Sequence, residues 1–234
     1  MSERRISVLS HFWAPLCAIG SRGPKGPNAQ ICVSVFGASI VPERPRLLVV
    51  LSKTNYTTEL VAASGTFAVT VLAEAQAGLL EPLGLHSGRE VSKLAGIAHT
   101  LTAMGDPAFG GAGSIACEVL RSFDFGDSRA FLAAVRDRTE TAEPPLSWQT
   151  AKGIVGEEFL ARWAAKSVRE QAAAREAMAW RGVGAGTHRQ GRGSARCMTP
   201  MRPGGGHSEM GTDSPALAFM GKTPVVYGRA RGAR

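Results

Sequence analysis

The sequence predicts a mainly β protein, an antiparallel barrel with attached helices and a disordered C-terminal tail. Two observations predict this fold class. Five or six short apolar runs, typical of strands, are separated by turns and short helical segments, without the regular strand–helix alternation of a parallel sheet. The last part of the chain, residues 181–234, is rich in Gly, Arg and Pro and has no hydrophobic periodicity, which favours disorder.

The first strands follow from apolar runs and from the residues that interrupt them. Residues 15–23 predict a strand, and the prolines and glycines of 24–28 predict a turn. Residues 29–41 predict a longer strand with Gly37 as a bulge or a point of close approach. The run 46–52, RLLVVLS, is continuously apolar and therefore predicts a central strand.

A short helix follows the central strand. Residues 56–65 have a helical pattern, either Thr54 or Asn55 can cap its start, and Gly65 stands where a helix commonly ends. The alternation of residues 66–73 then predicts the next strand.

The remainder divides into connectors, a strand pair and a helical extension. Residues 74–100 predict short helices and connectors, 114–126 and 129–138 predict two strands, and 145–180 predict one long charged helix or two, which pack on the barrel or on a partner subunit. We therefore expect three regions: a barrel domain over 1–143, a helical extension over 144–180 and a tail over 181–234.

Charge and apolar content exclude several classes of protein. The net charge is +8, but residues 1–180 carry only +1 and the tail carries +7. Basicity confined to a tail argues against a nucleic-acid-binding domain. No apolar run reaches the roughly 20 residues of a membrane helix and no secretory leader is evident, so a cytoplasmic location is expected.

The cysteines are not arranged to hold a metal. Cys17, Cys32, Cys117 and Cys197 are widely spaced, with no C-x-x-C pair, so we expect reduced thiols and no metal site. The apolar surroundings of the first three predict buried thiols.

A polar corner separates the central strand from the short helix. It contains Lys53, Thr54, Asn55, Thr57 and Thr58. A helix N-terminus offers free N–H groups and a positive dipole end, which together favour an anion such as a phosphate. The alternative is that Thr54 or Asn55 only caps the helix and that Lys53 is solvated.

Two segments, 28–72 and 105–135, carry motifs whose order is more informative than any single one. The first contains Ser34 and Ser39, then Pro45, the run 46–52, Lys53 with Thr57, and finally Gly65, Phe67, Val69, Val71 and Leu72. The second contains a Gly/Ala lead-in, the pair Cys117-Glu118, and Gly126-Asp127 before the last strand. In this order the motifs resemble the flavin reductase-like family of FMN-binding split barrels, over roughly residues 9–138.

The resemblance implies an antiparallel split β-barrel that binds FMN, with FAD as a possible substitute, and takes electrons from NADH or NADPH. The flavin ring would lie along strand 28–39 and its phosphate in the polar corner. The resemblance therefore implies eight cofactor-binding residues: Asn28, Gln30, Ser34, Ser39, Lys53, Thr54, Asn55 and Thr57. His86, in a Gly-rich loop, could cover the site.

The sequence departs from the family at one position. Where many members have Gly-Asp-His, this chain has Gly126-Asp127-Ser128-Arg129. Ser128 can form hydrogen bonds but carries no charge at neutral pH, and Arg129 either attracts a nucleotide phosphate or is simply solvated. Both residues are candidates for the nicotinamide side of the site.

Three functional hypotheses follow. The first is an NAD(P)H-dependent flavin reductase, a homodimer by resemblance, that supplies reduced flavin, for example to a monooxygenase partner. The second is a flavin-binding electron carrier or sensor without turnover, which the missing histidine favours. The third is nucleic-acid binding through the Arg-rich tail, for which only two aromatic residues are available to stack on bases. The tail composition is also that of an out-of-frame extension of GC-rich DNA.

Overall fold

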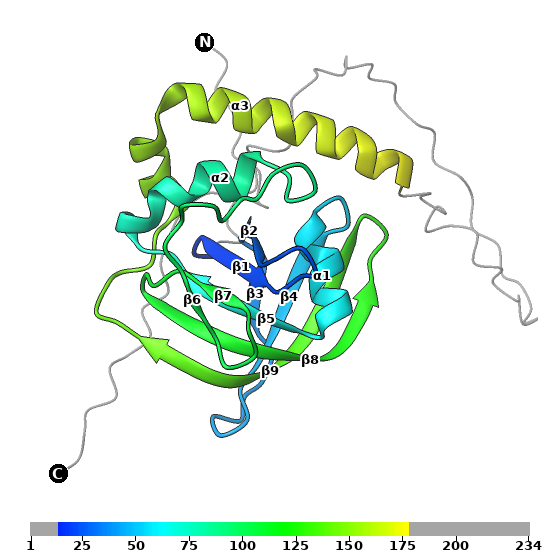
Figure 1. Cartoon of the computed structure of the whole chain (residues 1–234), viewed down its shortest axis with the longest axis vertical. Coiled ribbons are helices and arrows are strands. Elements are labelled where there is room, and N and C mark those ends of the chain that lie inside the picture. Colours follow the sequence, from blue (N-terminus) through cyan, green and yellow to red (C-terminus); the bar gives the residue numbers. More distant parts are fainter. Residues whose placement is uncertain (1–13, 178–234) are drawn as a thin grey trace, which may run out of the picture.

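A curled, seven-stranded antiparallel sheet forms the centre of the protein (Figure 1). The computed structural model describes residues 14–177. The strand order is β2–β1–β5–β8–β9–β4–β3. The strands are β1 (Cys17–Ser21), β2 (Asn28–Cys32), β3 (Val35–Gly37), β4 (Arg46–Ser52), β5 (Thr66–Val71), β8 (Gly113–Asp124) and β9 (Ser128–Glu140). The predicted split β-barrel is confirmed, and the run 46–52 forms β4, which is flanked by β9 and β3.

The link between β2 and β3 explains why the sheet curls. These strands lie at opposite edges of the sheet order, yet only Val33 and Ser34 separate them. The carbonyl of Ser34 accepts a 3.0 Å hydrogen bond from the N–H of Val50 in β4. One short segment therefore joins both edges, which is possible only if the sheet bends round on itself.

The prediction of one strand over residues 29–41 is therefore wrong. The strand starts one residue earlier, at Asn28, breaks after Cys32 and ends at Gly37, and residues 38–45 form a loop. Gly37 is the last residue of β3 rather than a bulge, and a Cβ there would meet open space. The break occurs because Ser34 bonds to β4 instead of extending the β2 ladder.

The interior of the barrel is apolar. Alternate residues of each strand point inward. The buried cluster comprises Cys17, Ile19, Cys32, Val49, Leu51, Val61, Phe67, Val69, Cys117, Phe131 and Ala133. Three of the cysteines are free and buried, as expected, and burial raises the pKa of Cys32 and of Cys117 to about 12. The fourth, Cys197, lies outside the described residues.

Short helices pack against the barrel. Helix α1 (Tyr56–Ser64) begins after Asn55 and ends at Gly65, which adopts a left-handed conformation with φ of 70° and donates its N–H to the carbonyl of Val61. Glycine accepts this conformation without a steric penalty, so the predicted end of the helix is confirmed. The 3-10 helix η2 (Glu74–Leu79) and helix α2 (Leu80–Leu85) follow.

A small hairpin was not anticipated from the sequence. Strands β6 (Thr100–Leu101) and β7 (Pro107–Ala108) form a separate two-stranded sheet. Each has only two residues, which is too short for alternation to be recognised.

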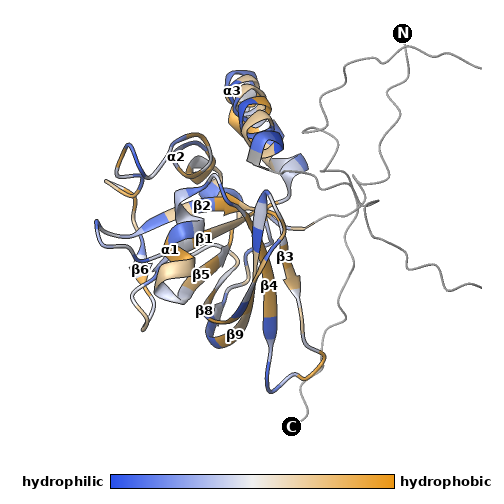
Figure 2. Ribbon diagram, turned by 90° about the vertical axis from the view of Figure 1, so that its right-hand side faces the viewer, coloured by the Kyte–Doolittle hydropathy of each residue, from blue (hydrophilic) through white to orange (hydrophobic). Residues whose placement is uncertain are grey.

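Helix α3 (Trp148–Ala177) lies across one end of the barrel as a separate layer, and the loop between β3 and β4 points the opposite way (Figures 1 and 2). Gly156 interrupts the helix with φ of 76° and ψ of 168°, so the extension is two helices joined at a kink. Leu146 ties its start to the barrel, because its N–H donates to Leu72 and its carbonyl accepts from Leu16.

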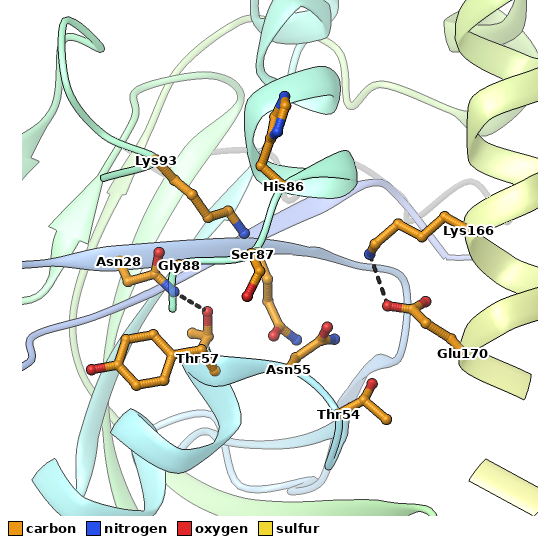
Figure 3. A pocket seen from close by; sticks show the side chains of 12 residues that line it. Asn28, Thr54, Asn55, Thr57, His86, Ser87, Gly88, Lys93, Lys166 and Glu170 are labelled. Carbon is orange, nitrogen blue, oxygen red and sulfur yellow. Dashed lines mark hydrogen bonds and ion pairs between the residues drawn. The ribbon is translucent and has the colours of Figure 1, made fainter. Parts of the chain in front are cut away.

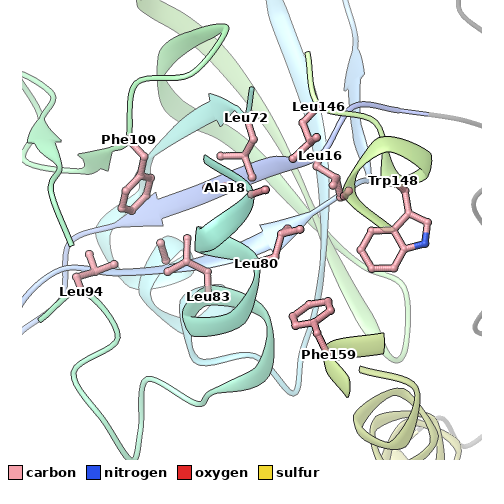
Figure 4. Close-up of a cluster of buried hydrophobic side chains, with 13 residues drawn as sticks. Leu16, Ala18, Leu72, Leu80, Leu83, Leu94, Phe109, Leu146, Trp148 and Phe159 are labelled. Atoms are coloured by element: carbon pink, nitrogen blue, oxygen red, sulfur yellow. The ribbon is translucent and has the colours of Figure 1, made fainter. Parts of the chain in front are cut away.

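A second apolar core joins the helices to the outer face of the sheet (Figure 4). Its large members are Leu16, Leu72, Leu80, Leu83, Leu94, Phe109, Leu146, Trp148 and Phe159. Trp163 of α3 packs so closely on Gly84 of α2 that a Cβ on that glycine would lie 2.3 Å from the indole ring. The contact holds α3 in a defined position over α2.

Within residues 14–177, none of the helices combines the length and the apolar character needed to cross a bilayer. The Arg-rich tail, and with it the predictions of disorder and of nucleic-acid binding, lies outside the described residues.

Candidate functional site

A polar pocket lies where the start of β2, the N-terminus of α1, the loop after α2 and helix α3 meet (Figure 3). Its lining residues are Asn28, Gln30, Thr54, Asn55, Tyr56, Thr57, His86, Ser87, Gly88, Lys93, Lys166 and Glu170. Its volume of about 70 Å³ is far below the roughly 300 Å³ at which cavities begin to enclose whole ligands. The pocket therefore suits one polar group of a larger ligand.

Two amides from β2 form one wall of the pocket. Asn28 and Gln30 are two residues apart and share a face of the strand. Nδ2 of Asn28 donates a 2.9 Å hydrogen bond to Oγ1 of Thr57 (Figure 3). Gln30 is only 5% exposed, and its Oε1 has no hydrogen-bond partner within the described residues. A buried polar atom without a partner is costly, and a bound ligand would satisfy it.

The loop after α2 passes so close to this wall that it requires a glycine. A Cβ on Gly88 would lie 2.4 Å from Oδ1 of Asn28. Only a residue without a side chain fits there while Asn28 keeps its orientation.

The polar corner is held together by hydroxyl groups. Oγ of Ser52 lies 2.8 Å from Oγ1 of Thr54, and Oγ1 of Thr58 donates a 2.6 Å hydrogen bond to the carbonyl of Ser52. Asn55 occupies the N-cap position without a side-chain capping bond, and its side chain lines the pocket. Because first-turn N–H groups of an α-helix have no acceptor within the helix, this end of α1 favours an anion.

Two lysines add positive charge opposite the corner. Nζ of Lys93 donates a 2.9 Å hydrogen bond to the carbonyl of Leu83 in the last turn of α2, where a cation complements the helix dipole. Burial lowers the pKa of Lys93 to about 8, and repulsion from Lys166 contributes, whereas Glu170 acts in the opposite direction. Nζ of Lys166 lies 2.8 Å from Oε1 of Glu170, one turn further along α3.

The structure brings together five of the eight cofactor-binding residues predicted from the sequence. Asn28, Gln30, Thr54, Asn55 and Thr57 all line the pocket. His86, from the Gly-rich loop, lines it as well.

The other three predicted residues lie outside the pocket. Ser34 lies in the link between β2 and β3, and Oγ of Ser39 accepts a 3.1 Å hydrogen bond from the N–H of Val41 in an exposed loop. Nζ of Lys53 lies 2.5 Å from a carboxylate oxygen of Asp124. The hydrogen bond from Lys53, followed by one from the Gly126 N–H, lowers the pKa of Asp124.

The two candidates for the nicotinamide side lie beside the polar corner rather than in the pocket. Ser128 is the direct partner of Ser52 in the β4–β9 ladder, and Arg129 is the partner of Leu51. The N–H of Lys53 also donates a 2.9 Å hydrogen bond to the carbonyl of Asp127. Strand pairing thus brings the β8–β9 turn next to the corner across more than 70 residues of sequence.

Sequence reasoning missed six residues of the pocket, namely Tyr56, Ser87, Gly88, Lys93, Lys166 and Glu170. Single lysines outside any motif carry no signal that distinguishes them from solvated ones. Gly88 was detectable only as part of a Gly-rich loop. The i, i+4 spacing of Lys166 and Glu170 is equally typical of an ordinary surface pair on a helix.

The pocket residues fit a flavin phosphate. Two lysines, the side-chain amides, several hydroxyls and the α1 N-terminus offer many donors to an anion, while the unpartnered Oε1 of Gln30 offers an acceptor to another part of the ligand. The curled antiparallel sheet, with this pocket at its rim, defines a split β-barrel.

Comparison with known protein families agrees with this fold. Residues 9–153 match the family described as "Flavin reductase like domain", and the chain belongs to this family.

Individual proteins are similar to parts of the chain. Nitrilotriacetate monooxygenase component B from Mycobacterium thermoresistibile is 28% identical, with a TM-score of 0.52 over 58% of this chain and 74% of that one. The FMN-binding protein of Thermus thermophilus is 25% identical, with a TM-score of 0.52 over 60% and 79%. High molecular weight rubredoxin of Moorella thermoacetica is 37% identical over 81 residues, so the match spans about a third of that relative and 34% of this chain.

Proposed function

We propose that this protein is a flavin reductase that binds FMN, oxidises NADH or NADPH and supplies reduced flavin. Family membership supports the flavin chemistry. The observation that carries the proposal is the pocket at the N-terminus of α1, where donors from β2, the polar corner and two lysines converge on a phosphate-sized space.

The chain's residues divide the binding of FMN between them. The α1 N-terminus, Asn55, Thr57 and the lysines hold the phosphate, and the buried amide of Gln30 bonds to the adjoining part of the ligand. These residues would hold the flavin, which when bound would supply the redox chemistry as the hydride acceptor. FAD also carries a phosphate at this position and is the alternative ligand.

Ser128 and Arg129 are proposed to lie on the nicotinamide side, next to the corner. Hydride transfer between two stacked rings needs no proton donor, so the absence of a histidine at Ser128 is compatible with turnover. Arg129 supplies a positive charge that attracts a phosphate of the nucleotide.

We also propose a homodimer. Phe36 pairs with Leu48, and Leu48 pairs with Leu132, so the three share the outer face of the sheet. Phe36 is 49% exposed although it is a large apolar residue, and Figure 2 shows apolar ribbon along β3. An exposed apolar face of this kind marks an interaction surface.

A monooxygenase is the proposed recipient of the reduced flavin. The similarity to a component of nitrilotriacetate monooxygenase supports this role. A cytoplasmic location remains a prediction.

An anaerobic assay tests the proposal. Purified protein at catalytic concentration is mixed with excess FMN, and NADH or NADPH is added while the absorbance of oxidised flavin is followed. We expect the absorbance of oxidised flavin to fall with at least one nucleotide. It should fall much more slowly when the protein is omitted.

The assay also distinguishes the second candidate function. Tight FMN binding without bleaching by either nucleotide would indicate an electron carrier or sensor, which the serine at position 128 favours. No FMN binding at all would contradict both functions.

A further inference from the structure

Helix α3 contributes two charged side chains to the pocket from outside the segment that defines the family. The family match ends at residue 153, whereas Lys166 and Glu170 lie beyond it. Trp163 against Gly84, and the ion pair of Arg162 with Glu81 at 2.6 Å, hold α3 on α2 one turn before Lys166. These contacts between α2 and α3 therefore fix the position of Lys166 and Glu170 over the pocket.

The pair has an arrangement that opposes tight anion binding. A phosphate in the pocket would be stabilised by the ammonium group of Lys166, yet Oε1 of Glu170 already lies 2.8 Å from that group. Glu170 also lines the pocket itself, among groups that otherwise favour an anion. The amide oxygen Oε1 of Gln30 has no hydrogen-bond partner within the described residues although Gln30 is only 5% exposed, which indicates independently that the pocket receives a ligand with a donor for it.

We propose that Glu170 competes with the flavin phosphate for Lys166 and thereby keeps the flavin exchangeable. The inference rests on the proposed function and deepens it, because a reductase that supplies reduced flavin must release it. In the free protein Lys166 pairs with Glu170. When the phosphate binds, Lys166 turns to the phosphate, and the cost of separating the ion pair lowers the affinity and speeds release.

The test compares FMN with riboflavin, which lacks the phosphate, in variants of the full chain. Dissociation constants come from quenching of flavin fluorescence, and release rates from stopped-flow displacement. Glu170→Gln keeps the shape and removes the charge. We expect it to bind FMN about three- to tenfold more tightly, mainly through slower release, and to leave riboflavin unchanged.

Two variants serve as matched controls. Glu157→Gln removes the same charge from an exposed position of the same helix, 13 residues away, which is about 20 Å and beyond the Debye length of about 8 Å. It should bind FMN as the wild type does. Glu170→Asp keeps the charge and should restore most of the wild-type release rate.

A double variant separates competition from simple repulsion. Lys166→Met should weaken FMN binding, and in that background Glu170→Gln should change the FMN affinity by less than about twofold, since the lysine that Glu170 pairs with is gone. If Glu170→Gln tightened FMN equally with and without Lys166, Glu170 would act by direct repulsion, and the competition would be refuted.

The remaining outcomes distinguish this inference from the proposed function. Equal FMN affinity and release in the wild type, Glu170→Gln and Glu157→Gln would overturn the inference alone. If neither the wild type nor any variant bound FMN, the proposed function would be overturned as well.

Discussion

The side chain of Asn28, at the start of β2, donates a 2.9 Å hydrogen bond to the hydroxyl of Thr57 in the first turn of α1, although the two residues are 29 positions apart. Both are almost fully buried. The bond fixes the strand wall of the pocket against the helix end that faces it, so the two halves of the proposed phosphate site depend on each other.

Thr57→Val should therefore affect both stability and binding. The substitution keeps the shape and leaves Nδ2 of Asn28 buried without an acceptor, which costs about 1–3 kcal/mol of the free energy of unfolding. We expect this loss in urea denaturation and a roughly tenfold weaker FMN affinity in fluorescence titration.

Thr70→Val is the matched control for that prediction. Thr70, in β5, is equally buried and accepts a 3.1 Å hydrogen bond from the N–H of Phe109, but it does not line the pocket. Its loss should lower stability and leave the FMN dissociation constant within about twofold of the wild type. Equal effects of both substitutions on FMN would contradict a specific role for Thr57.

Gly88→Ala should damage the pocket without touching the ligand directly. The added Cβ would lie 2.4 Å from Oδ1 of Asn28, so the amide must turn away from its place in the wall. FMN should bind about tenfold more weakly by titration. Gly78→Ala, where a Cβ meets open space, is the control and should bind FMN normally.

The affinity for FMN should fall as the pH rises through about 8. The pKa of Lys93 is about 8 in the free protein because of burial and the nearby Lys166, with Glu170 acting in the opposite direction. A bound phosphate favours the protonated lysine, so binding above this pH requires uptake of a proton. The affinity should then approach a tenfold loss per pH unit.

Titrations at several pH values check the role of Lys93. Riboflavin, without a phosphate, should show no such slope, and Lys93→Met should remove the slope for FMN. A slope that persists in Lys93→Met would assign the titration to another group.

Phe36→Glu should weaken the proposed dimer. Phe36 shares the outer face of the sheet with Leu48 and Leu132, and a carboxylate at its centre would be unpaired in an apolar interface. Light scattering during gel filtration should show a dimer for the wild type and a shift toward monomer for the variant.

Val91→Glu is the control for the dimer prediction. Val91 is as exposed as Phe36, at 49%, but lies in the loop after α2. It should leave the dimer intact. A monomeric wild type would refute the homodimer.

Local patterns in the sequence were sufficient for most of the fold. The apolar run of β4, the alternation of β5 and the left-handed Gly65 at the end of α1 are each determined by residues within a few positions of one another. The order of the motifs was sufficient for the family, and hence for the split barrel. Five of the eight predicted binding residues line the pocket, and they come from two short stretches within that motif order, residues 28–30 and 54–57.

Other features depend on contacts between segments that are distant in the sequence, and only the tertiary structure shows them. The break between β2 and β3 arises because Ser34 bonds to β4, and no residue near the break signals it. Lys93, Lys166 and Glu170 reach the pocket because α2 and α3 pack over it, through contacts such as Trp163 with Gly84. Propensity and periodicity act over a few residues, whereas these positions are selected by the way the hydrophobic cores close. The sequence by itself therefore determined the barrel, the polar corner and the family, and the packing of the helices determined which charges meet there.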